Sequence, residues 1–239
     1  RNAGICIDIS ERKLEEKILN VELELFEFAI NHSEEELLRK FLDEAEKLTG
    51  SEIGFYHDIE DDQESISLQT WSSNTLNSMC KGSGEATRHY PISEAGVWID
   101  CIKERKPVIH NDYSSLAHKK GLPEGHAPVI RELVVPVIRG KQIVAVLGVG
   151  NKKSDYNQTD AKSVQRLADV AWETVVRKQA EENLQNTFDL SPSIICKANL
   201  NTGYFTEANQ AVTRILGYTV EEFTSIPFIE LIHPDDQQK

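Results

Sequence analysis

The sequence predicts an α+β domain in which an antiparallel sheet is covered by helices on one side. Two amphipathic helical patterns enclose the central part of the chain, the first between Ser33 and Gly50 and the second after Asn157. Short runs of alternating apolar and polar residues, typical of half-buried strands, lie between them. Two strand-like runs, 133–138 and 142–149, are separated by only three residues, which indicates a β-hairpin.

The elements of this domain follow from local signals in chain order. Ser33 and Glu36 have the spacing of a capping box, and Gly50 ends the first helix. Between this helix and the hairpin we expect strands at 53–59 and 66–70, a short helix at 97–106 after Gly96, and a strand at 107–110 that enters a long loop. The last helix is capped by Asn157 and Asp160, and its inward residues are Val164, Ala168, Ala171 and Val175.

The helix before this domain carries two apolar stripes. Residues 1–10 alternate as a short strand, and residues 11–32 form the helix. The first stripe has coiled-coil spacing and consists of Leu14, Ile18, Val21, Leu25 and Phe28. The second stripe consists of Leu19, Leu23, Phe26 and Ile30. We expect a parallel homodimer held mainly through the first stripe, and the alternative is a helix packed on its own domain.

Composition limits the classes of partner. Lys and Arg number 26 against 39 Asp and Glu, a net charge of −13, which argues against a nucleic-acid surface. No apolar run approaches the roughly 20 residues that span a bilayer, so we expect no membrane insertion. The four cysteines are widely spaced and suggest neither a disulfide scaffold nor a zinc knuckle. The start at Arg1, without a Met or a secretory signal, suggests a piece of a longer cytoplasmic protein.

The central part of the chain contains a dense set of short motifs: Gly96-Val-Trp98, Arg105-Lys-Pro-Val108, His110-Asn-Asp-Tyr113, Gly121-Leu-Pro-Glu-Gly-His126, Arg131-Glu-Leu-Val-Val-Pro136 and Val149-Gly-Asn-Lys152. Together they closely resemble a GAF-domain subtype typical of sensor histidine kinases. Both ends resemble parts of PAS domains, the first through residues 8–13 and the second through motifs that run from Phe188 to His233-Pro-Asp-Asp236. The charged connector at 12–19 also recurs at 177–184, as in tandem modules joined by helices.

The resemblance implies a domain order. It consists of the end of one PAS domain at 1–10, a signalling helix at 11–32, the GAF domain at 33–176, a helical connector at 177–187 and the first half of a second PAS domain at 188–239. No kinase or cyclase motif is present in this sequence, so we expect a non-enzymatic part of a two-component signalling protein. The expected function is sensing of a small ligand in the GAF pocket, with a ligand-free dimerisation spacer as the alternative.

Candidate ligand-binding residues come from the motif positions. They are Trp98, Cys101, His110, Asn111, Asp112, Tyr113, His126 and Arg131. Asn111 and Asp112 also have a purely structural interpretation, because Asx side chains commonly cap turns. Arg131 and Glu132 are neighbours in a strand, so at most one of them should face the pocket.

Three cofactor or redox chemistries are conceivable for the same region. Some GAF domains bind haem, and the resemblance therefore allows Cys101 with His110 or His126 as axial ligands. Zinc held by Cys101, His110, His118 and His126 is disfavoured, because no pair among them has finger-like spacing. Reduction of free methionine sulfoxide needs a nucleophilic and a resolving cysteine; nothing in the flanks of Cys80 and Cys101 supports that role.

Overall fold

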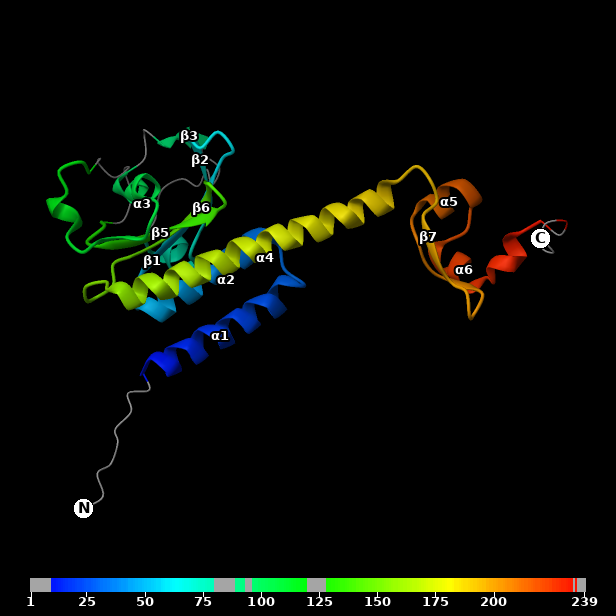
Figure 1. Ribbon diagram of the computed structural model, residues 1–239, viewed down its shortest axis with the longest axis horizontal. Coiled ribbons are helices and arrows are strands. Elements are labelled where there is room, and N and C mark those ends of the chain that lie inside the picture. Colours follow the sequence, from blue (N-terminus) through cyan, green and yellow to red (C-terminus); the bar gives the residue numbers. More distant parts are fainter. Residues whose placement is uncertain (1–9, 80–88, 93–95, 120–127, 234, 236–239) are drawn as a thin grey trace, which may run out of the picture. The chain divides into compact units, whose positions relative to one another are not determined.

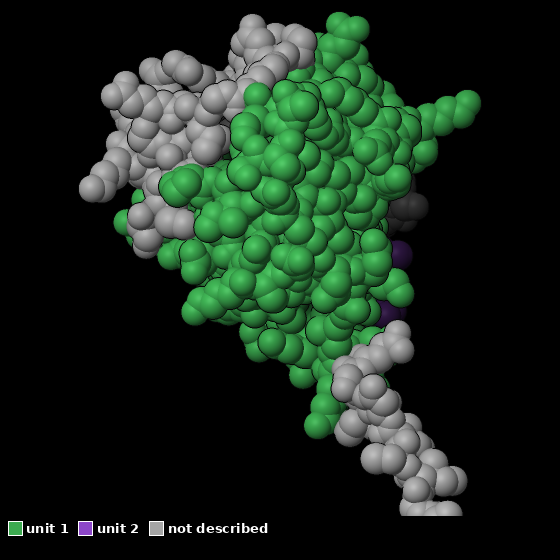
Figure 2. All heavy atoms as spheres, turned by 90° about the vertical axis from the view of Figure 1, so that its left-hand side faces the viewer, with its two compact units in different colours: residues 1–176 green, residues 177–239 purple. Residues whose placement is uncertain are grey.

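The computed structural model describes residues 10–79, 89–92, 96–119, 128–233 and 235 (Figure 1). The chain divides into two compact units, Arg1–Val176 and Arg177–Lys239, which are green and purple in Figure 2. Helix α4 (Gln158–Leu190) begins in the first unit and ends in the second.

Unit 1 is built on a six-stranded antiparallel sheet with the strand order β3-β2-β1-β6-β5-β4. Its strands are β1 (Ile53–Ile59), β2 (Ser65–Trp71), β3 (His89–Pro91), β4 (Val108–His110), β5 (Glu132–Arg139) and β6 (Gln142–Gly150). The β5–β6 hairpin closes at the Arg139–Gln142 pair, and Gly140 takes the left-handed φ of 60° that the turn requires. The antiparallel sheet, its covering helices and this hairpin confirm the predicted fold class.

Three helices pack on one face of this sheet: α1 (Ser10–Ala29), α2 (Glu34–Thr49) and α4 (Figure 1). The predicted capping box at Ser33 and Glu36 is present, and Gly50 ends α2 in the left-handed conformation. Asn157 accepts hydrogen bonds from the first turn of α4, as expected. The helices bury their apolar sides against Tyr56 of β1, Leu133, Val135 and Val137 of β5, and Ala145, Leu147 and Val149 of β6.

The opposite face of the sheet is covered by the 3-10 turn η3 (Val97–Ile99) and helix α3 (Asp100–Glu104). The expectation that all helices lie on one side was therefore wrong. Alternate residues of the central strands supply this second core, for example Val134 of β5 and Val146 of β6. Strands that are apolar on both faces need cover on both faces, because either face alone would leave apolar area in water.

Helix α1 is part of the core of unit 1. Ile18, Val21 and Leu25, all from the first stripe, are buried with α2 and α4, and Leu25 has no exposed surface. These three residues are covered within the same chain, as in the alternative of a helix packed on its own domain, whereas Leu14 and Phe28 of the same stripe are only partly buried. The second stripe is exposed: Leu19 by 50%, Leu23 by 55%, Phe26 by 36% and Ile30 by 75%.

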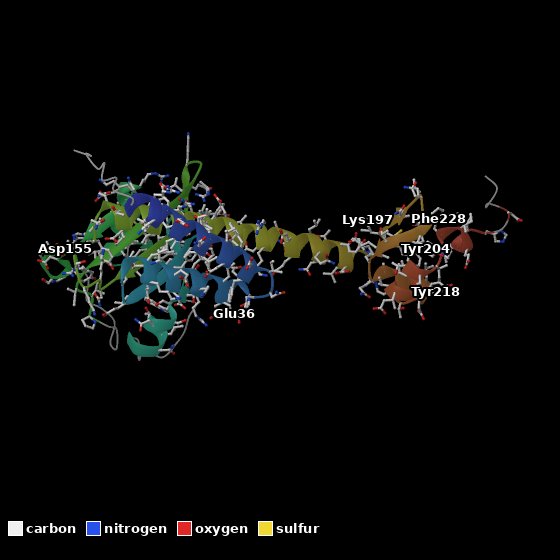
Figure 3. The ribbon with its side chains drawn as sticks, turned by 90° about the horizontal axis from the view of Figure 1, so that it is seen from below. Glu36, Asp155, Lys197, Tyr204, Tyr218 and Phe228 are labelled. Carbon is white, nitrogen blue, oxygen red and sulfur yellow. The ribbon has the colours of Figure 1, made fainter. Side chains whose placement is uncertain are left out.

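Unit 2 contains a two-stranded antiparallel sheet and short helices. After the end of α4 come β7 (Cys196–Asn199), β8 (Tyr204–Ala208), α5 (Ala211–Leu216), α6 (Val220–Ser225) and the 3-10 turn η5 (Phe228–Leu231). Gly203 and Gly217 adopt the left-handed conformation, at the end of the β7–β8 turn and at the end of α5. Lys197 and Glu207 pair across the hairpin; Lys197 is labelled in Figure 3 with Tyr204, Tyr218 and Phe228.

Candidate functional site

Four titratable side chains form a connected cluster on the α3 side of the sheet. Glu132 begins β5, and its Oε1 lies 2.9 Å from Nδ1 of His110 at the end of β4. The other nitrogen of His110, Nε2, lies 3.5 Å from Oδ2 of Asp100 in α3. Nε2 of His118 lies 2.6 Å from the same oxygen of Asp100. The contacts thus connect Glu132, His110, Asp100 and His118 in this order, from a buried carboxyl group to an exposed imidazole.

Local folding explains how this cluster forms. His110 and Glu132 are directly opposite each other in the antiparallel β4–β5 pair, which brings cross-strand side chains within reach. The hydrogen bond with Glu132 raises the pKa of His110, and the charges of Asp100 and Glu104 act in the same direction. Burial acts against this shift in His110, and burial also raises the pKa of the Glu132 carboxyl. His110 and Glu132 therefore form a poorly solvated pair joined by one hydrogen bond.

An aromatic group lies on the same face of the sheet. The ring of Trp98 stacks on His57, with centroids 4.5 Å apart and planes inclined by 6°. Phe55 contacts both rings edge-on. Burial lowers the pKa of His57 to about 3, so its imidazole is neutral at physiological pH. Trp98 itself is only partly buried, and it therefore presents an aromatic surface on the same face of the sheet as the polar cluster.

Cys101 is fully buried among Ile99, Val134 and Val146. Burial raises the pKa of its thiol, and the nearby Glu132 and Asp100 raise it further. A thiol held neutral is neither a nucleophile nor a metal ligand. His110 is also unsuited to ligation, because both of its ring nitrogens face carboxylates. These two residues do not fit the haem-ligand pair considered from the sequence.

Asn111 and Asp112 have structural partners. The side-chain amide of Asn111 donates to the carbonyl of Tyr156 and accepts from its backbone N–H, at 3.1 and 2.7 Å. Asp112 caps the 3-10 turn η4 (Tyr113–Ser115), accepting hydrogen bonds from Ser114 Oγ and the Ser115 amide. These contacts match the turn-capping alternative. Tyr113 is buried, and the charge of Glu132 acts on its hydroxyl.

Arg131 and Glu132 point to opposite sides of their strand, as the sequence predicts. Arg131 donates from Nη1 to the carbonyl of Lys152 at 2.8 Å, and its Nη2 lies 3.5 Å from Asp155, which is labelled in Figure 3. Its Nε is buried without a hydrogen-bond partner. His126 lies outside the described residues.

The structure thus places Trp98 and Cys101 in one apolar cluster on the α3 face and joins His110 to Glu132 and Asp100 on the same face. Asn111, Asp112 and Arg131 have partners elsewhere. Sequence reasoning missed Asp100 and His57 as members of the group. The alternation of Phe55, His57 and Ile59 on one face of β1 could have identified His57. Asp100 gave no such signal, because its contact with His118 depends on how the turn after η4 folds back.

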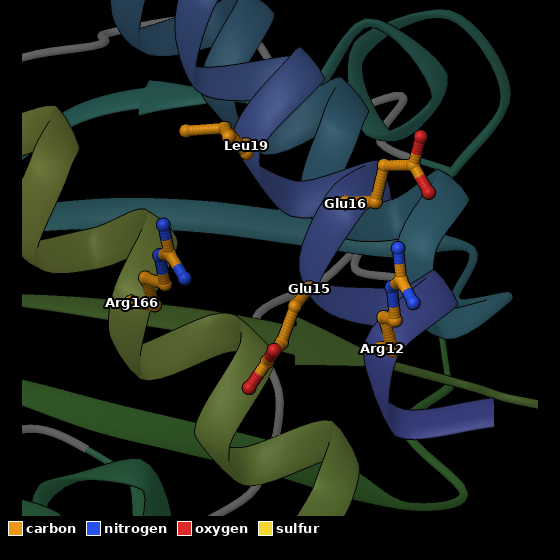
Figure 4. A pocket seen from close by; sticks show the side chains of 5 residues that line it. All are labelled: Arg12, Glu15, Glu16, Leu19 and Arg166. Carbon is orange, nitrogen blue, oxygen red and sulfur yellow. The ribbon is translucent and has the colours of Figure 1, made fainter. Parts of the chain in front are cut away.

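A hollow of about 580 Å³ lies elsewhere, beside α1 and α4 (Figure 4). It is lined by Arg12, Glu15, Glu16, Leu19 and Arg166, none of which was a predicted site residue. Among the described residues, no group of three or more His, Cys, Asp or Glu side chains is arranged to hold a metal ion. Nor does any helix in the described part of the chain combine the length and apolar character needed to cross a membrane.

The family model of the GAF domain matches residues 31–176, which is more than half of the chain. The chain therefore belongs to the GAF domain family. Over 144 residues, 60% of this chain, it is 35% identical to the methyl sulfide methyltransferase-associated sensor of Methanosarcina acetivorans. The matched part covers only 14% of that sensor's length.

Solved structures show the same fold at low sequence identity. A methyl-accepting chemotaxis protein matches with a TM-score of 0.53 and 18% identity over 66% of this chain and 98% of its own. The GAF domain of an Acinetobacter phosphoenolpyruvate-protein phosphotransferase gives 0.54 and 16%, over 68% and 94%. Free methionine-R-sulfoxide reductase from Neisseria meningitidis gives 0.53 and 13%, over 76% and 98%. The last of these is an enzyme, so the fold alone does not decide between catalysis and sensing.

Proposed function

We propose that this chain is a sensory module of a larger signal-transduction protein. The observation that carries the proposal is that α1 and α4, the helices at the two ends of unit 1, share one core with the sheet. A change in the sheet must therefore be accommodated by the helices that connect the module to its neighbours. The sensor from Methanosarcina acetivorans, matched over 144 residues, supports the same assignment.

The ligand site that we propose is the α3 face of the sheet, which carries both the stacked Trp98 and His57 rings and the hydrogen-bonded residues Glu132, His110 and Asp100. An aromatic surface next to a few convergent polar groups is typical of small-molecule sites. The polar groups there are two carboxyl groups and an imidazole, so we expect a small polar ligand with hydrogen-bond donors. Cys101 supports the wall of this site by packing and takes no chemical part in it.

Signal transmission in this proposal needs a ligand that favours one of two packings of the helices on the sheet. Typical coupling free energies between two sites are about 1–3 kcal/mol. The ion pair between Glu22 of α1 and Arg166 of α4 joins the two helices directly and is one contact that such a change would alter.

We further propose that the module works as a parallel homodimer through the second stripe of α1. Leu19, Leu23, Phe26 and Ile30 recur with steps of four, three and four residues, the spacing of a coiled-coil seam. They are exposed by a third or more of their surface, unlike the first stripe. A matching helix of a second copy would remove these side chains from water.

The surrounding protein is proposed from the resemblance of both ends to PAS domains. Unit 2 supports this, because its hairpin and short helices leave Leu200, Ile215 and Ile229 largely exposed, as expected for part of a larger domain. We propose a cytoplasmic sensor histidine kinase of a two-component system as the parent, with its catalytic part outside this sequence.

The alternative is a dimerising spacer that carries signals between neighbouring domains without a ligand of its own. The tight packing of Cys101 and the position of the hollow away from the α3 face favour this alternative. It has the same helices and the same core, so only occupancy of the α3 face separates the two functions.

Native mass spectrometry of the purified chain tests this proposal. A sensory module should carry a non-covalent small molecule, and Trp98→Ala should lose it. Trp172→Ala is the matched control, because Trp172 packs on the opposite face of the sheet beneath Arg139. The spacer would be favoured if the wild-type chain shows only the mass of the polypeptide, both as purified and after incubation with a cell extract.

A further inference from the structure

Helix α2 places two carboxylates against the turn that follows β2, far from the α3 face. Asp43 accepts hydrogen bonds from the backbone N–H and the hydroxyl of Ser73, both at 2.8 Å. Glu46, one turn further along α2, accepts a hydrogen bond from the hydroxyl of Ser72 through Oε1. Both carboxylates therefore bind the same short segment, residues 72–75.

The bond to Glu46 is the end of a chain of hydrogen bonds. The N–H of Gly54 in β1 donates to Oγ1 of Thr75 at 3.0 Å, and Thr75 Oγ1 lies 2.7 Å from Ser72 Oγ. Gly54 makes this approach feasible, since a Cβ there would lie 3.1 Å from Cβ of Ser72 and 3.2 Å from Oε1 of Glu46. The carboxyl of Glu46 thus links α2, β1 and the turn after β2.

The surroundings of Glu46 oppose its ionisation. Its side chain is 7% exposed, and the charged groups that act on it, Asp43 and Glu52, are both acidic. The groups that face it from β1 and the turn, Gly54, Ser72 and Thr75, carry no charge. Burial is the largest cause and outweighs the hydrogen bond from Ser72, which lowers the pKa, so that the pKa of Glu46 rises to about 7.

Glu44, two residues away, shows the contrast. It is 8% exposed, but Lys40 and Lys47 pair with it at 3.1 and 2.7 Å, and the pKa of its carboxyl is lowered. Two residues of similar exposure on the same helix therefore have opposite shifts, because Glu44 has cationic partners, whereas the Glu46 carboxyl is more strongly desolvated and has acidic neighbours.

We propose that Glu46 is a proton-operated latch that docks residues 72–75 on α2 when its carboxyl is neutral and favours their release when it ionises. A single proton passes between the carboxyl and water, and no other bond changes. Release lets the carboxylate of Glu46 reach water. The latch makes the helical layer of the GAF domain sensitive to pH, whether or not the α3 face binds a ligand.

The direction of the pH effect follows from linkage. The pKa of Glu46 in the folded state, about 7, is higher than its usual value of 4.5. The docked state therefore gains stability from the bound proton below pH 4.5 and loses it as the pH rises through 7. Between pH 6 and pH 8 this amounts to about a tenfold change in the ratio of docked to released segment.

Amide hydrogen exchange of the full 239-residue chain tests the latch. The reporters are the N–H groups of Gly54, Thr75 and Leu76, whose acceptors are Thr75 Oγ1, Ser72 Oγ and the Ser72 carbonyl. Their protection factors, corrected for intrinsic exchange, should fall about tenfold from pH 6 to pH 8. Glu46→Gln, which keeps the shape of the neutral carboxyl, should abolish this fall, and Glu44→Gln should leave it intact.

Protection factors that do not change between pH 6 and pH 8, or a Glu46→Gln variant that keeps the fall, would overturn the proposal. A second measurement covers the case in which the variant does not fold. The ¹³C resonance of the Glu46 carboxyl in the wild-type chain should titrate with a midpoint near 7, and a midpoint below 5 would contradict the latch equally.

Discussion

Glu22 of α1 and Arg166 of α4 form a two-point ion pair, in which Arg166 donates from Nε to Oε1 and, at 2.8 Å, from Nη2 to Oε2. The two residues are 144 positions apart in the chain. Glu22 is 7% exposed, so the pair fixes a nearly buried carboxylate between the first helix of unit 1 and the last. It is the direct polar connection between the two ends of the module.

Replacing Arg166 with Leu should therefore destabilise unit 1 by about 1–3 kcal/mol, since the Glu22 carboxylate would remain buried without its partner. Urea unfolding of the variant measures this cost. Arg177→Leu is the control, because Arg177 and its partner Glu181 are exposed by 60% and 72%, and such surface pairs contribute about 0–1 kcal/mol. An equal effect of the two substitutions would argue against a structural role for the Glu22 pair.

A second prediction separates the two stripes of α1 by their effect on folding. Leu25→Ala should cost about 2–5 kcal/mol of unfolding free energy, because Leu25 has no exposed surface and its removal leaves a cavity. Leu23→Ala, two residues away and 55% exposed in the single chain, should cost less than about 1 kcal/mol at protein concentrations low enough to keep the chain monomeric. Thermal or urea denaturation of both variants gives the comparison. Similar losses for both would mean that α1 is not part of the core.

The exposed stripe should instead control association. Leu23→Glu with Ile30→Glu places charges in the proposed helix–helix interface, where unpaired buried carboxylates are strongly unfavourable. Sedimentation velocity should show a dimer for the wild type and a monomer for the variant, with unchanged circular dichroism. Glu24→Lys, on the same helix outside both stripes, should remain dimeric. A wild-type chain that is monomeric at a concentration of tens of micromolar would contradict the proposed homodimer.

His110 should make the stability of unit 1 depend on pH. Its hydrogen bond with Glu132 raises its pKa above the usual 6.5, so the folded state binds the proton more tightly than the unfolded state. The stability from this contact is complete below pH 6.5 and is lost as the pH rises through the raised value. The free-energy difference between wild type and His110→Gln, measured by urea unfolding, should therefore be larger at pH 6 than at pH 9. A difference that is the same at both pH values would contradict the assigned proton.

Local signals in the sequence were sufficient for much of the fold. The capping box at Ser33, the Gly50 helix end and the turn at Gly140 each depend on one or a few neighbouring residues, and each is present. The choice of stripe on α1 could not be made in this way. Both stripes have helical spacing and similar apolar residues, and only packing against α2 and α4 decides which one is buried.

The candidate site was predictable only in part for the same reason. His110 and Trp98 were identified from motif positions, whereas the partners that define their chemistry come from elsewhere in the chain. Asp100 and Glu132 become neighbours of His110 through α3 and through the β4–β5 register, and His57 reaches Trp98 from β1. Arg131 lies one residue from Glu132 but points away, because side chains alternate along a strand.

Hydrogen exchange measured by mass spectrometry tests the central claim, that occupancy of the α3 face is coupled to the terminal helices. The chain as purified would be compared with the same chain after denaturation, desalting and refolding, which removes any non-covalent molecule. The account predicts faster exchange in the refolded chain at residues 96–110 and also at residues 12–29 of α1. Identical exchange in the two preparations, or a difference confined to residues 96–110, would contradict the coupling between the site and the helices.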